Sequence, residues 1–485
     1  MRIYNRIMTV ILLLFLGGCS NWLDVSPENT VDEQELFSTG EGYRNALNGI
    51  YRQMSLTSMY GQEMSWGLVD VMGQMYSTTG LTVYNNPYGI VARDYAYDAS
   101  EVKSLIQTIW SNAYNTIANC NNIIGRIVAE EPSKFRGGEE EQSMIYGEAL
   151  AVRALLHFDL LRLFAPAPVT KPAGNWIPYF ENYPSTYEPD KSVPEILSLV
   201  ERDLLQAKEL IANFDTLSGK PMLHPEKRIK NEYVSNSVTD LFFLYRGFRM
   251  NYYAVTALLA RVYNYMGDYE KAARCAGEVI DARIEELVAD CFPLTDAAKV
   301  KDNDRKRYGE VIFALSNTKN VDNYEVYHTT GNAKLYLADY AACFDDNSDV
   351  RKTDLTEALG AERVCNKYIL PSNNLSVYTS TEDLIPMIRV SEMYYIQAEY
   401  LYRSGNTQEA VEKLDVVRVA RNCTKGRLTI SSTAEFEEEL IKEARREFMQ
   451  EGQLYYYFKR LNIKPSVSMP DGAFVFPLPD NELIN

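Results

Sequence analysis

The stretch RVSEMYYIQAEYLYRSGNTQEAVEKLDVVRVAR, residues 389–421, decides the fold of this chain. Apolar residues recur at steps of three and four over its first half, which predicts a helix with one buried face. Gly405 is placed to end that helix, and either of the two residues that follow can cap a second one. Ala410 and Leu414 then continue at helical spacing. The stretch therefore predicts two helices that reverse at a glycine.

The same spacing occurs again in ALLARVYNYMGDYEKAARCAGEV, residues 257–279. Alanine at a helix crossing lets two backbones approach closely, and glycine makes the tight reversal between them. This pattern is typical of the tetratricopeptide hairpin, which buries its apolar face only by packing against another such unit. The positions that agree at one constant offset are Ala260, Tyr263, Gly267, Ala272 and Ala276 in the first copy and Ala398, Leu401, Gly405, Ala410 and Leu414 in the second.

The remaining chain alternates helical patterns with two long irregular stretches. Helical periodicity predicts further helices over residues 42–54, 101–128, 139–164, 193–214 and 435–450. We call residues 57–100 the first insertion and residues 290–383 the second insertion, with short strands expected at 311–315 and 367–370. The fold class is thus mainly α: a tetratricopeptide-like helical hairpin scaffold with long irregular loop insertions and a few short strands. Loops of this length usually carry function or are disordered.

The N-terminus has the pattern of an exported lipoprotein. Arg2 and Arg6 precede an apolar run over residues 7–16 that is too short to span a bilayer. The run ends in Leu-Gly-Gly-Cys, which is typical of a bacterial lipobox, so residues 1–18 are expected to be removed and Cys19 acylated. An ordinary signal peptide with a chance cysteine is the alternative. The acylated chain would be anchored to a membrane and would not span it.

Composition limits the partners. The net charge of −17 and the lack of a basic run argue against nucleic acid. Six cysteines follow Cys19 without a CxxC motif, and we expect mostly buried thiols with room for one disulfide. Thirty-five tyrosines are an unusual excess. Most of them should pack in the core, although a flat ring with a polar tip also suits stacking on a sugar.

A series of short motifs follows one another along the chain. The motifs are Cys19 with Leu23-Asp24-Val25 and Pro27; Trp110, Tyr114, Ile117 and Asn121-Asn122; Ala151, Arg153, Ala154, Phe158, Leu161, Phe164 and Pro166; Asp349 and Arg351; Arg389 to Met393 with Ala398-Glu399; Arg445-Arg446-Glu447-Phe448, Glu451-Gly452 and Phe458-Lys459-Arg460; and Pro477-Leu478-Pro479 with Glu482. In this order they resemble the SusD/RagB family of nutrient-uptake outer-membrane lipoproteins. Each motif is weak alone, but their order along the chain makes the resemblance strong. Departures are His157 where tyrosine is common and Gln453 with three tyrosines after the Glu-Gly pair, which indicates a divergent branch.

The resemblance implies a single SusD-like domain over residues 19–485, with an N-terminal half to about 240 and a C-terminal half from about 250. It implies four tetratricopeptide-like units and a loop-built ligand face. It also implies an outer-membrane location facing the cell exterior, an oligosaccharide ligand, and a SusC-like TonB-dependent transporter as partner. A peptide or another nutrient as cargo, and a scaffold protein without a ligand, remain alternatives.

Aromatic and polar residues in the two insertions are the ligand-binding candidates. Rings would stack on sugars, and amide, guanidinium and carboxylate groups would bond their hydroxyls. The alternative for each ring is that it packs its loop onto the scaffold. The candidates are Trp66, Tyr76, Tyr84, Asn85, Asn86, Tyr88 and Arg93 in the first insertion and Tyr324 and Tyr327 in the second, with a third aromatic loop around Trp176, Tyr179 and Tyr183.

Catalysis and metal binding find little support. The three histidines form no catalytic motif, and His157 lies among apolar helix positions as a core histidine would. Acidic pairs are numerous, so a paired-carboxylate glycosidase stays open, but we expect no enzyme and no cofactor. Asp345, Asn347 and Asp349 alternate like half of an EF-hand loop, yet Val350 replaces the required glycine. A structural calcium is therefore possible but not expected.

Overall fold

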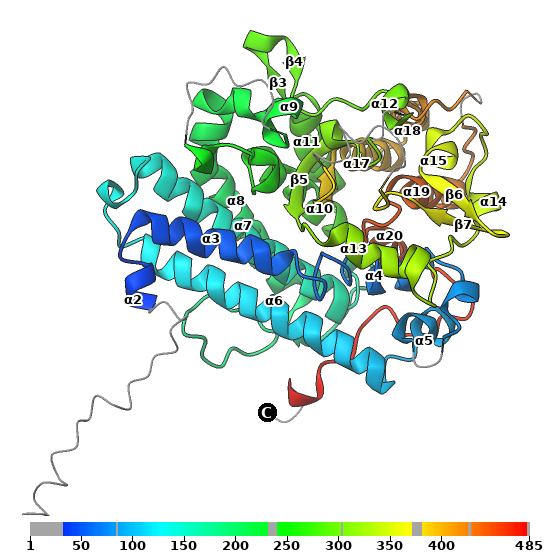
Figure 1. Cartoon of the computed structure of the whole chain (residues 1–485), viewed down its shortest axis with the longest axis horizontal. Helices are drawn as coiled ribbons and strands as arrows, with labels where there is room; N and C mark the ends of the chain where they lie inside the picture. Colours follow the sequence, from blue (N-terminus) through cyan, green and yellow to red (C-terminus); the bar gives the residue numbers. More distant parts are fainter. Residues whose placement is uncertain are drawn as a thin grey trace, which may run out of the picture.

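The computed structural model describes residues 33–83, 86–230, 240–301, 304–370, 381–424 and 428–482. The signal segment and Cys19 lie outside these ranges. Within them the chain is mainly helical, with four small two-stranded sheets (Figure 1). The principal helices are α3 (Gly40–Met54), α6 (Ser100–Ile127), α7 (Gly138–Phe164), α8 (Val193–Asn213), α10 (Tyr252–Met266), α11 (Tyr269–Ile280), α17 (Val390–Arg403), α18 (Thr407–Ala420), α19 (Thr433–Glu447) and α20 (Leu454–Leu461).

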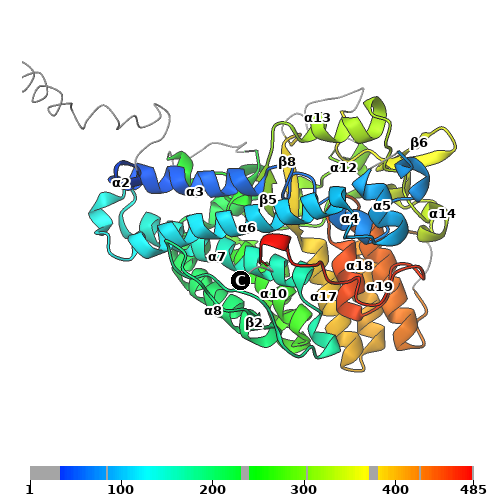
Figure 2. The same ribbon diagram turned by 90° about the horizontal axis from the view of Figure 1, so that it is seen from below.

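Eight of these helices form a continuous stack of antiparallel pairs. In stacking order, α3 packs on α6, α7 on α8, α10 on α11 and α17 on α18, and each pair also contacts the next (Figures 1 and 2). The four tetratricopeptide-like units implied by the family resemblance are therefore present. The helix boundaries predicted from periodicity agree with the structure to within a few residues, because each helix has a long apolar face to bury.

The two hairpins found in the sequence close in the same way. Gly267 and Gly405 both lie in the left-handed region, with φ of 86° and 87°. The amide of the following residue then bonds back across the turn, from Asp268 N to Tyr263 O (2.9 Å) and from Asn406 N to Leu401 O (2.9 Å). This is the Schellman arrangement that a glycine after a helix favours. The repeat in the sequence is thus a repeat of hydrogen bonds.

A small antiparallel sheet connects the scaffold to the second insertion. Strand β5 (Val311–Ser316) pairs with β8 (Leu384–Arg389), and β8 runs directly into α17. The sequence predicts β5 but not β8, because β8 is buried along its whole length and so shows no alternation. The strand predicted at residues 367–370 is wrong. The chain there forms a turn, and the strands lie just before it as the hairpin of β6 (Thr356–Leu359) and β7 (Glu362–Cys365).

The last part of the chain also differs from expectation. Helix α19 stops at Glu447, three residues before the predicted end, because Gln450 has a φ of 65°. A further helix, α20, follows, which the sequence analysis missed. Gly452 between them has a φ of 67°, and a Cβ there would lie 2.4 Å from the carbonyl oxygen of Met64. Because Gly452 has no side chain, the backbone of the first insertion can pack directly against the C-terminal half at this Glu-Gly motif.

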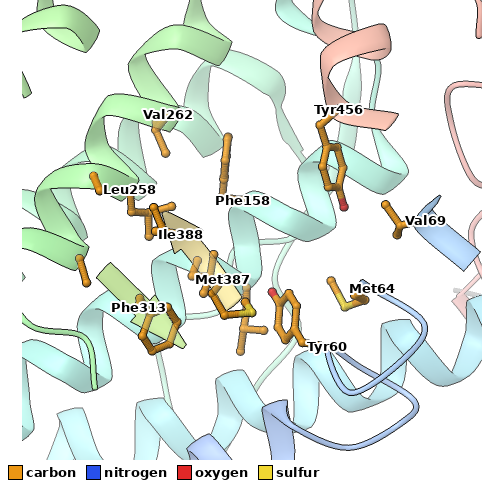
Figure 3. Close-up of a cluster of buried hydrophobic side chains, with 14 of the residues drawn as sticks. Tyr60, Met64, Val69, Phe158, Leu258, Val262, Phe313, Met387, Ile388 and Tyr456 are labelled. Atoms are coloured by element: carbon orange, nitrogen blue, oxygen red, sulfur yellow. The ribbon is translucent and has the colours of Figure 1, made fainter. Parts of the chain in front are cut away.

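The first insertion is largely irregular, as the sequence predicts, but most of it is buried in the core. It contains α4 (Leu68–Met72) and α5 (Pro87–Asp94), and Figure 3 shows three of its side chains in the central cluster of buried residues. Their partners come from α7, α10, α20 and the β5–β8 sheet, so this segment joins both halves of the chain. The labelled members of the cluster are Tyr60, Met64, Val69, Phe158, Leu258, Val262, Phe313, Met387, Ile388 and Tyr456.

Many of the charged family motifs form one buried ion-pair network. Arg389 bonds Glu447 and Glu451, and Arg421 bonds Glu447 and Glu310, with the shortest distances 2.5 to 3.0 Å. Removing one member would leave buried charges unpaired, which costs about 3–5 kcal/mol. The pairing explains how these charged residues are accommodated in the interior.

The D.R element joins the same network. Arg351 bonds Asp349 (2.7 Å) and Glu443 (2.8 Å) in the interior. Asp345 bonds Arg446, and Asn347 accepts from Lys352. The oxygen atoms that resemble half of an EF-hand loop thus contact cationic side chains.

Two further features complete the fold. All six cysteines after Cys19 carry free thiols, and five of them are buried, so the disulfide that the sequence allows is not formed. Among the residues that the structure describes, no helix has the length and apolar character needed to cross a membrane.

Candidate functional site

The structure brings the sequence-predicted aromatic residues together from both insertions. The ring of Trp66 lies 5.3 Å from that of Tyr324 and 5.7 Å from that of Tyr327. The rings of Tyr88 and Tyr327 are 5.5 Å apart, and the Tyr76 hydroxyl donates to the main-chain oxygen of Trp66 (2.8 Å). We call these five residues the aromatic cluster. The structure thus joins candidates from the two insertions, which the sequence offers as separate sites.

Burial corrects the role predicted for this cluster. Trp66 and Tyr324 are 0% exposed, and Tyr76 and Tyr88 are 1% exposed. A sugar cannot stack on rings that are enclosed by protein, so in this structure these four residues pack the two insertions together. Tyr327 is half-buried and covers the cluster from the π-helical turn η12 (Val326–Thr330). The alternative that a ring packs its loop onto the scaffold therefore holds for four of the nine ligand-binding candidates, namely Trp66, Tyr76, Tyr88 and Tyr324.

The hydroxyl groups of the cluster are also satisfied internally. The Tyr88 hydroxyl lies 3.0 Å from both carboxylate oxygens of Glu63, and the Tyr324 hydroxyl donates to Cys365 O (2.9 Å). Burial raises the pKa of Glu63 to about 7, although hydrogen bonds from Tyr88 and from the Leu68 amide act against the shift. This interior carboxyl group is close to half-protonated at neutral pH.

The other candidates have separate surroundings. Asn86 caps α5 by accepting from the Tyr88 amide (3.1 Å), which is the ordinary role of asparagine at a helix start. Arg93 is exposed and pairs with Asp94 at 2.6 Å. Tyr84 and Asn85 lie outside the described residues.

The third aromatic loop divides in the same way. Tyr179 is buried and stacks on His157, with ring centroids 3.8 Å apart, whereas Tyr183 is 43% exposed. His157 also accepts from the Phe180 amide, and burial lowers its pKa to about 3. It is therefore a neutral core histidine with a partner, as the sequence predicts.

The two insertions meet at the surface beside the aromatic cluster. Main-chain hydrogen bonds join Ser77 N to Tyr336 O (2.7 Å), Lys334 N to Gly80 O (2.7 Å) and Ala338 N to Met75 O (2.9 Å). Both views place α4, α5, α13 (Asn320–Glu325), α14 (Tyr340–Cys343) and β6 at one end of the molecule (Figures 1 and 2). Segments that are more than 200 residues apart in sequence therefore build one surface.

A groove of about 680 Å³ opens along this junction. We call it the insertion groove. Its size is that of a typical small-ligand site, and its lining is mostly polar. The lining comes from the first insertion, the second insertion and the turn after α20: Gln74, Tyr76, Ser77, Thr78, Leu337, Ala338, Asp339, Tyr340, Ala341, Ala342, Ala361, Glu362, Arg363, Pro465 and Ser466.

One aromatic ring is available in the insertion groove. Tyr340 is half-buried, and its hydroxyl donates to Lys352 O (3.2 Å), which fixes the ring. The Arg363 guanidinium lies 4.9 Å from the centre of the same ring and donates to Thr356 O and Oγ1. Asp339 is exposed and Glu362 is half-buried, and neither side-chain carboxylate has a hydrogen bond or ion pair within the described ranges. A fixed ring beside open carboxylates can hold a polyhydroxylated ligand by stacking and hydrogen bonding.

Among the residues that line the groove, Tyr76 is the one that the sequence offers as a ligand-binding candidate. Tyr340, Asp339, Glu362 and Arg363 were not selected, because they stand in a region without periodicity or aromatic clustering. These residues lie at the start of α14 and on the β6–β7 hairpin, which are too short to show a hydrophobic period, so no local pattern indicates them.

Neither metal binding nor general-base chemistry stands out. Throughout the part of the chain that the structure describes, no three His, Cys, Asp or Glu side chains gather as a metal site requires. His328 is buried with its Nε2 3.1 Å from a Glu357 oxygen, and burial lowers its pKa.

Family models match nearly the whole described chain. One, described as "Starch-binding associating with outer membrane", matches residues 21–229, and another, described as "SusD family", matches residues 234–475. The chain belongs to the SusD family. The boundary between the two matches falls between α9 (Pro225–Arg228) and α10.

Curated relatives are distant and match over part of their length. "SusD-like protein P2" of Formosa agariphila is 24% identical over 311 residues, which is 61% of this chain and 51% of the relative. "SusD-like protein P25" of the same organism is 25% identical over 169 residues, or 35% of this chain and 31% of the relative. The chain thus matches about half or less of the length of these relatives.

Solved structures share the fold over most of both chains. A SusD superfamily protein from Bacteroides thetaiotaomicron has a TM-score of 0.69 at 22% identity, covering 92% of this chain and 97% of the other. A SusD superfamily protein from Bacteroides vulgatus gives 0.68 at 21%, with the same coverage. A putative sugar binding protein from Bacteroides vulgatus gives 0.63 at 22%, with 87% of each chain covered. These likenesses establish the fold.

Proposed function

We propose that this protein captures oligosaccharides at the cell surface and delivers them to a SusC-like TonB-dependent transporter in the outer membrane. The observation that carries the proposal is the insertion groove, a polar groove with one fixed aromatic ring in a chain of the SusD family. The starch-binding description of one matching model and the sugar-binding name of a structural neighbour support the ligand class.

The groove would act as a capture site and not as a catalyst. Tyr340 would stack on the apolar face of a sugar ring, and Asp339, Glu362 and Gln74 would accept or donate hydrogen bonds to its hydroxyls. Such contacts hold a ligand weakly enough to be passed on, and each depends on side chains that the scaffold already positions. The protein would therefore bind glycans without hydrolysing them.

Cys19 would hold the groove at the membrane. Acyl chains on that cysteine would anchor the chain to the outer membrane, and the helical scaffold would carry the groove next to the transporter. Mass spectrometry of the membrane-extracted protein tests the anchor directly. Acyl groups on an N-terminal Cys19 are expected, and Cys19→Ser should leave the protein in the soluble fraction.

The ligand is tested by a glycan array with full-length protein in a detergent that contains no sugar. Wild type is expected to bind at least one oligosaccharide class, and Tyr340→Ala should weaken that binding without unfolding the protein. Binding that survives Tyr340→Ala would move the site away from the insertion groove. Binding of peptide mixtures in place of every glycan would favour the peptide cargo that the sequence left open.

A further inference from the structure

The charges in the insertion groove are unevenly available to a ligand. Asp339 and Glu362 line the groove, and their side-chain carboxylates make no hydrogen bond or ion pair within the described chain. Arg363 is the one Lys or Arg among the described lining residues. The groove therefore offers more free acceptors than free cationic donors.

Arg363 is held in one orientation by its contacts, although its Nε is buried without a hydrogen-bond partner in the described chain. Its Nη2 donates to Thr356 Oγ1 (2.8 Å) and Thr356 O (3.1 Å), and its guanidinium lies over the Tyr340 ring. Turning it toward a ligand anion would give up these contacts. A guanidinium that pairs with carboxylates does so best with both edges free, which Arg363 lacks.

The neighbouring cation is committed as well. Arg445 is buried beside the groove, within electrostatic reach of Asp339, and its Nη1 donates to the main-chain oxygen of Gln74 (2.5 Å). That bond holds its guanidinium against the main chain of the first insertion, and Arg445 is not among the residues that line the groove. The overall charge of −17 adds a further, screened repulsion for anions.

We propose that the insertion groove selects uncharged oligosaccharides and rejects uronate-containing and sulfated ones. The inference rests on the proposed function and adds the charge class of its ligand. Free carboxylates accept hydrogen bonds from neighbouring hydroxyls of a neutral sugar. A carboxylate or sulfate at the same place donates nothing and faces Asp339 or Glu362 as a like charge.

The size of the effect follows from Coulomb's law. Repulsion between two like charges about 4 Å apart in a water-like medium lowers the affinity of the ligand about fivefold. The loss is larger in a drier groove. Each anionic group placed against Asp339 or Glu362 is therefore expected to weaken binding by about fivefold or more at low salt. Salt should reduce this difference but leave the affinity for the neutral ligand nearly unchanged.

The test compares a matched ligand pair on the full-length protein. The tightest neutral glycan on an array is oxidised at its primary hydroxyls to carboxylates, and both forms are titrated by calorimetry. The neutral form should bind at least fivefold more tightly. The double variant Asp339→Asn with Glu362→Gln should reduce the ratio of the two affinities by a factor of three or more. It replaces both carboxylates with amides of nearly the same shape.

A control variant separates local from overall charge. Asp281→Asn with Glu286→Gln changes the net charge by the same amount, at exposed positions on α11's C-terminal cap and the η10 turn (Glu285–Leu287). This control variant should leave the affinity ratio of the neutral and oxidised ligands unchanged. An equal fall of that ratio in both double variants would overturn selection by Asp339 and Glu362.

The remaining outcomes distinguish this inference from the proposed function. If the tightest glycans on the array are anionic, or if the oxidised form binds as well as the neutral form, charge selection is wrong while glycan capture stands. If no glycan binds, both are wrong. If the neutral form binds more tightly, and only the Asp339/Glu362 double variant reduces this difference in affinity, both glycan capture and charge selection are supported.

Discussion

The aromatic cluster and the insertion groove lie side by side at one end of the molecule, and they have opposite characters. The cluster has five aromatic rings, four of which are almost completely enclosed. The groove has a single available ring, Tyr340, but it is open and carries free carboxylates. An abundance of aromatic residues therefore marks the place where the two insertions are held together, and the open groove lies next to it.

The largest expected effect comes from the enclosed side of this comparison. Trp66→Ala would leave a cavity among Tyr324, Tyr327 and the surrounding core, and should lower the free energy of unfolding by about 3–5 kcal/mol. Urea denaturation measures the loss. Unchanged stability combined with lost glycan binding would mean that Trp66 is accessible in solution, which would reverse the comparison.

A second effect depends on pH. The folded-state pKa of Glu63 is about 7, above its ordinary value of 4.5, so the folded protein binds this proton more tightly than the unfolded chain. Below about pH 4.5 the Glu63 carboxyl is protonated in both the folded and the unfolded chain, and its burial carries no ionisation penalty. As the pH rises from 4.5 to 7, the free energy of unfolding falls, and above that the loss is on the order of 3 kcal/mol. Glu63→Gln should remove this cost.

The stability difference between Glu63→Gln and wild type is the quantity to measure. It should favour the variant at pH 8 and shrink toward zero at pH 4.5, by chemical denaturation at each pH. A constant difference across this range would show that Glu63 is ionised in the folded protein, and that the cluster is wetter than its burial indicates.

The junction between the two regions can be strained directly. A Cβ at Gly80 would lie 2.1 Å from Lys334 O, so Gly80→Ala must push the insertions apart. We expect a loss of about 1–3 kcal/mol in stability together with weaker ligand binding, because the groove shares this junction. Gly49→Ala is the matched control, since nothing lies within 4 Å of its added Cβ. Equal behaviour of the two variants would contradict the close contact.

The smallest expected change in stability belongs to the open side. Tyr340→Ala should cost less than about 1 kcal/mol in stability but weaken glycan binding by about tenfold, as loss of a central contact residue does. Thermal unfolding and calorimetric titration of the same preparation measure both. Tyr187, which is 82% exposed, provides the control, and Tyr187→Ala should change neither quantity. A large fall in stability for Tyr340→Ala would place it with the cluster.

Helices and their reversals could be predicted because their signals are local. Ala260, Gly267 and their counterparts Ala398 and Gly405 mark the same crossing and turn in both hairpins, and the structure places them so. The buried strand β8 could not be predicted in this way. An enclosed strand has no polar face, so its sequence shows no period, and its partner β5 lies some seventy residues earlier.

The candidate site shows the same limit more sharply. Trp66 and Tyr88 could be selected from one insertion and Tyr324 and Tyr327 from the other, but only the structure shows that they meet. Their burial could not be inferred, because a tyrosine that stacks on a ligand and one that packs in a core have the same local sequence. The family motifs around Arg389 were similarly informative about the fold and silent about the ligand.

The sequence by itself determined the helical hairpin scaffold, the expectation of a lipoprotein signal and the family. Each of these depends on residues that are close together in the chain, where helix period, glycine reversal and short motifs act. The tertiary structure alone decided which aromatic side chains are enclosed and which one, Tyr340, borders an open groove. Exposure is set by contacts between the two insertions, more than 200 residues apart, and such contacts leave no mark on the local pattern of either segment.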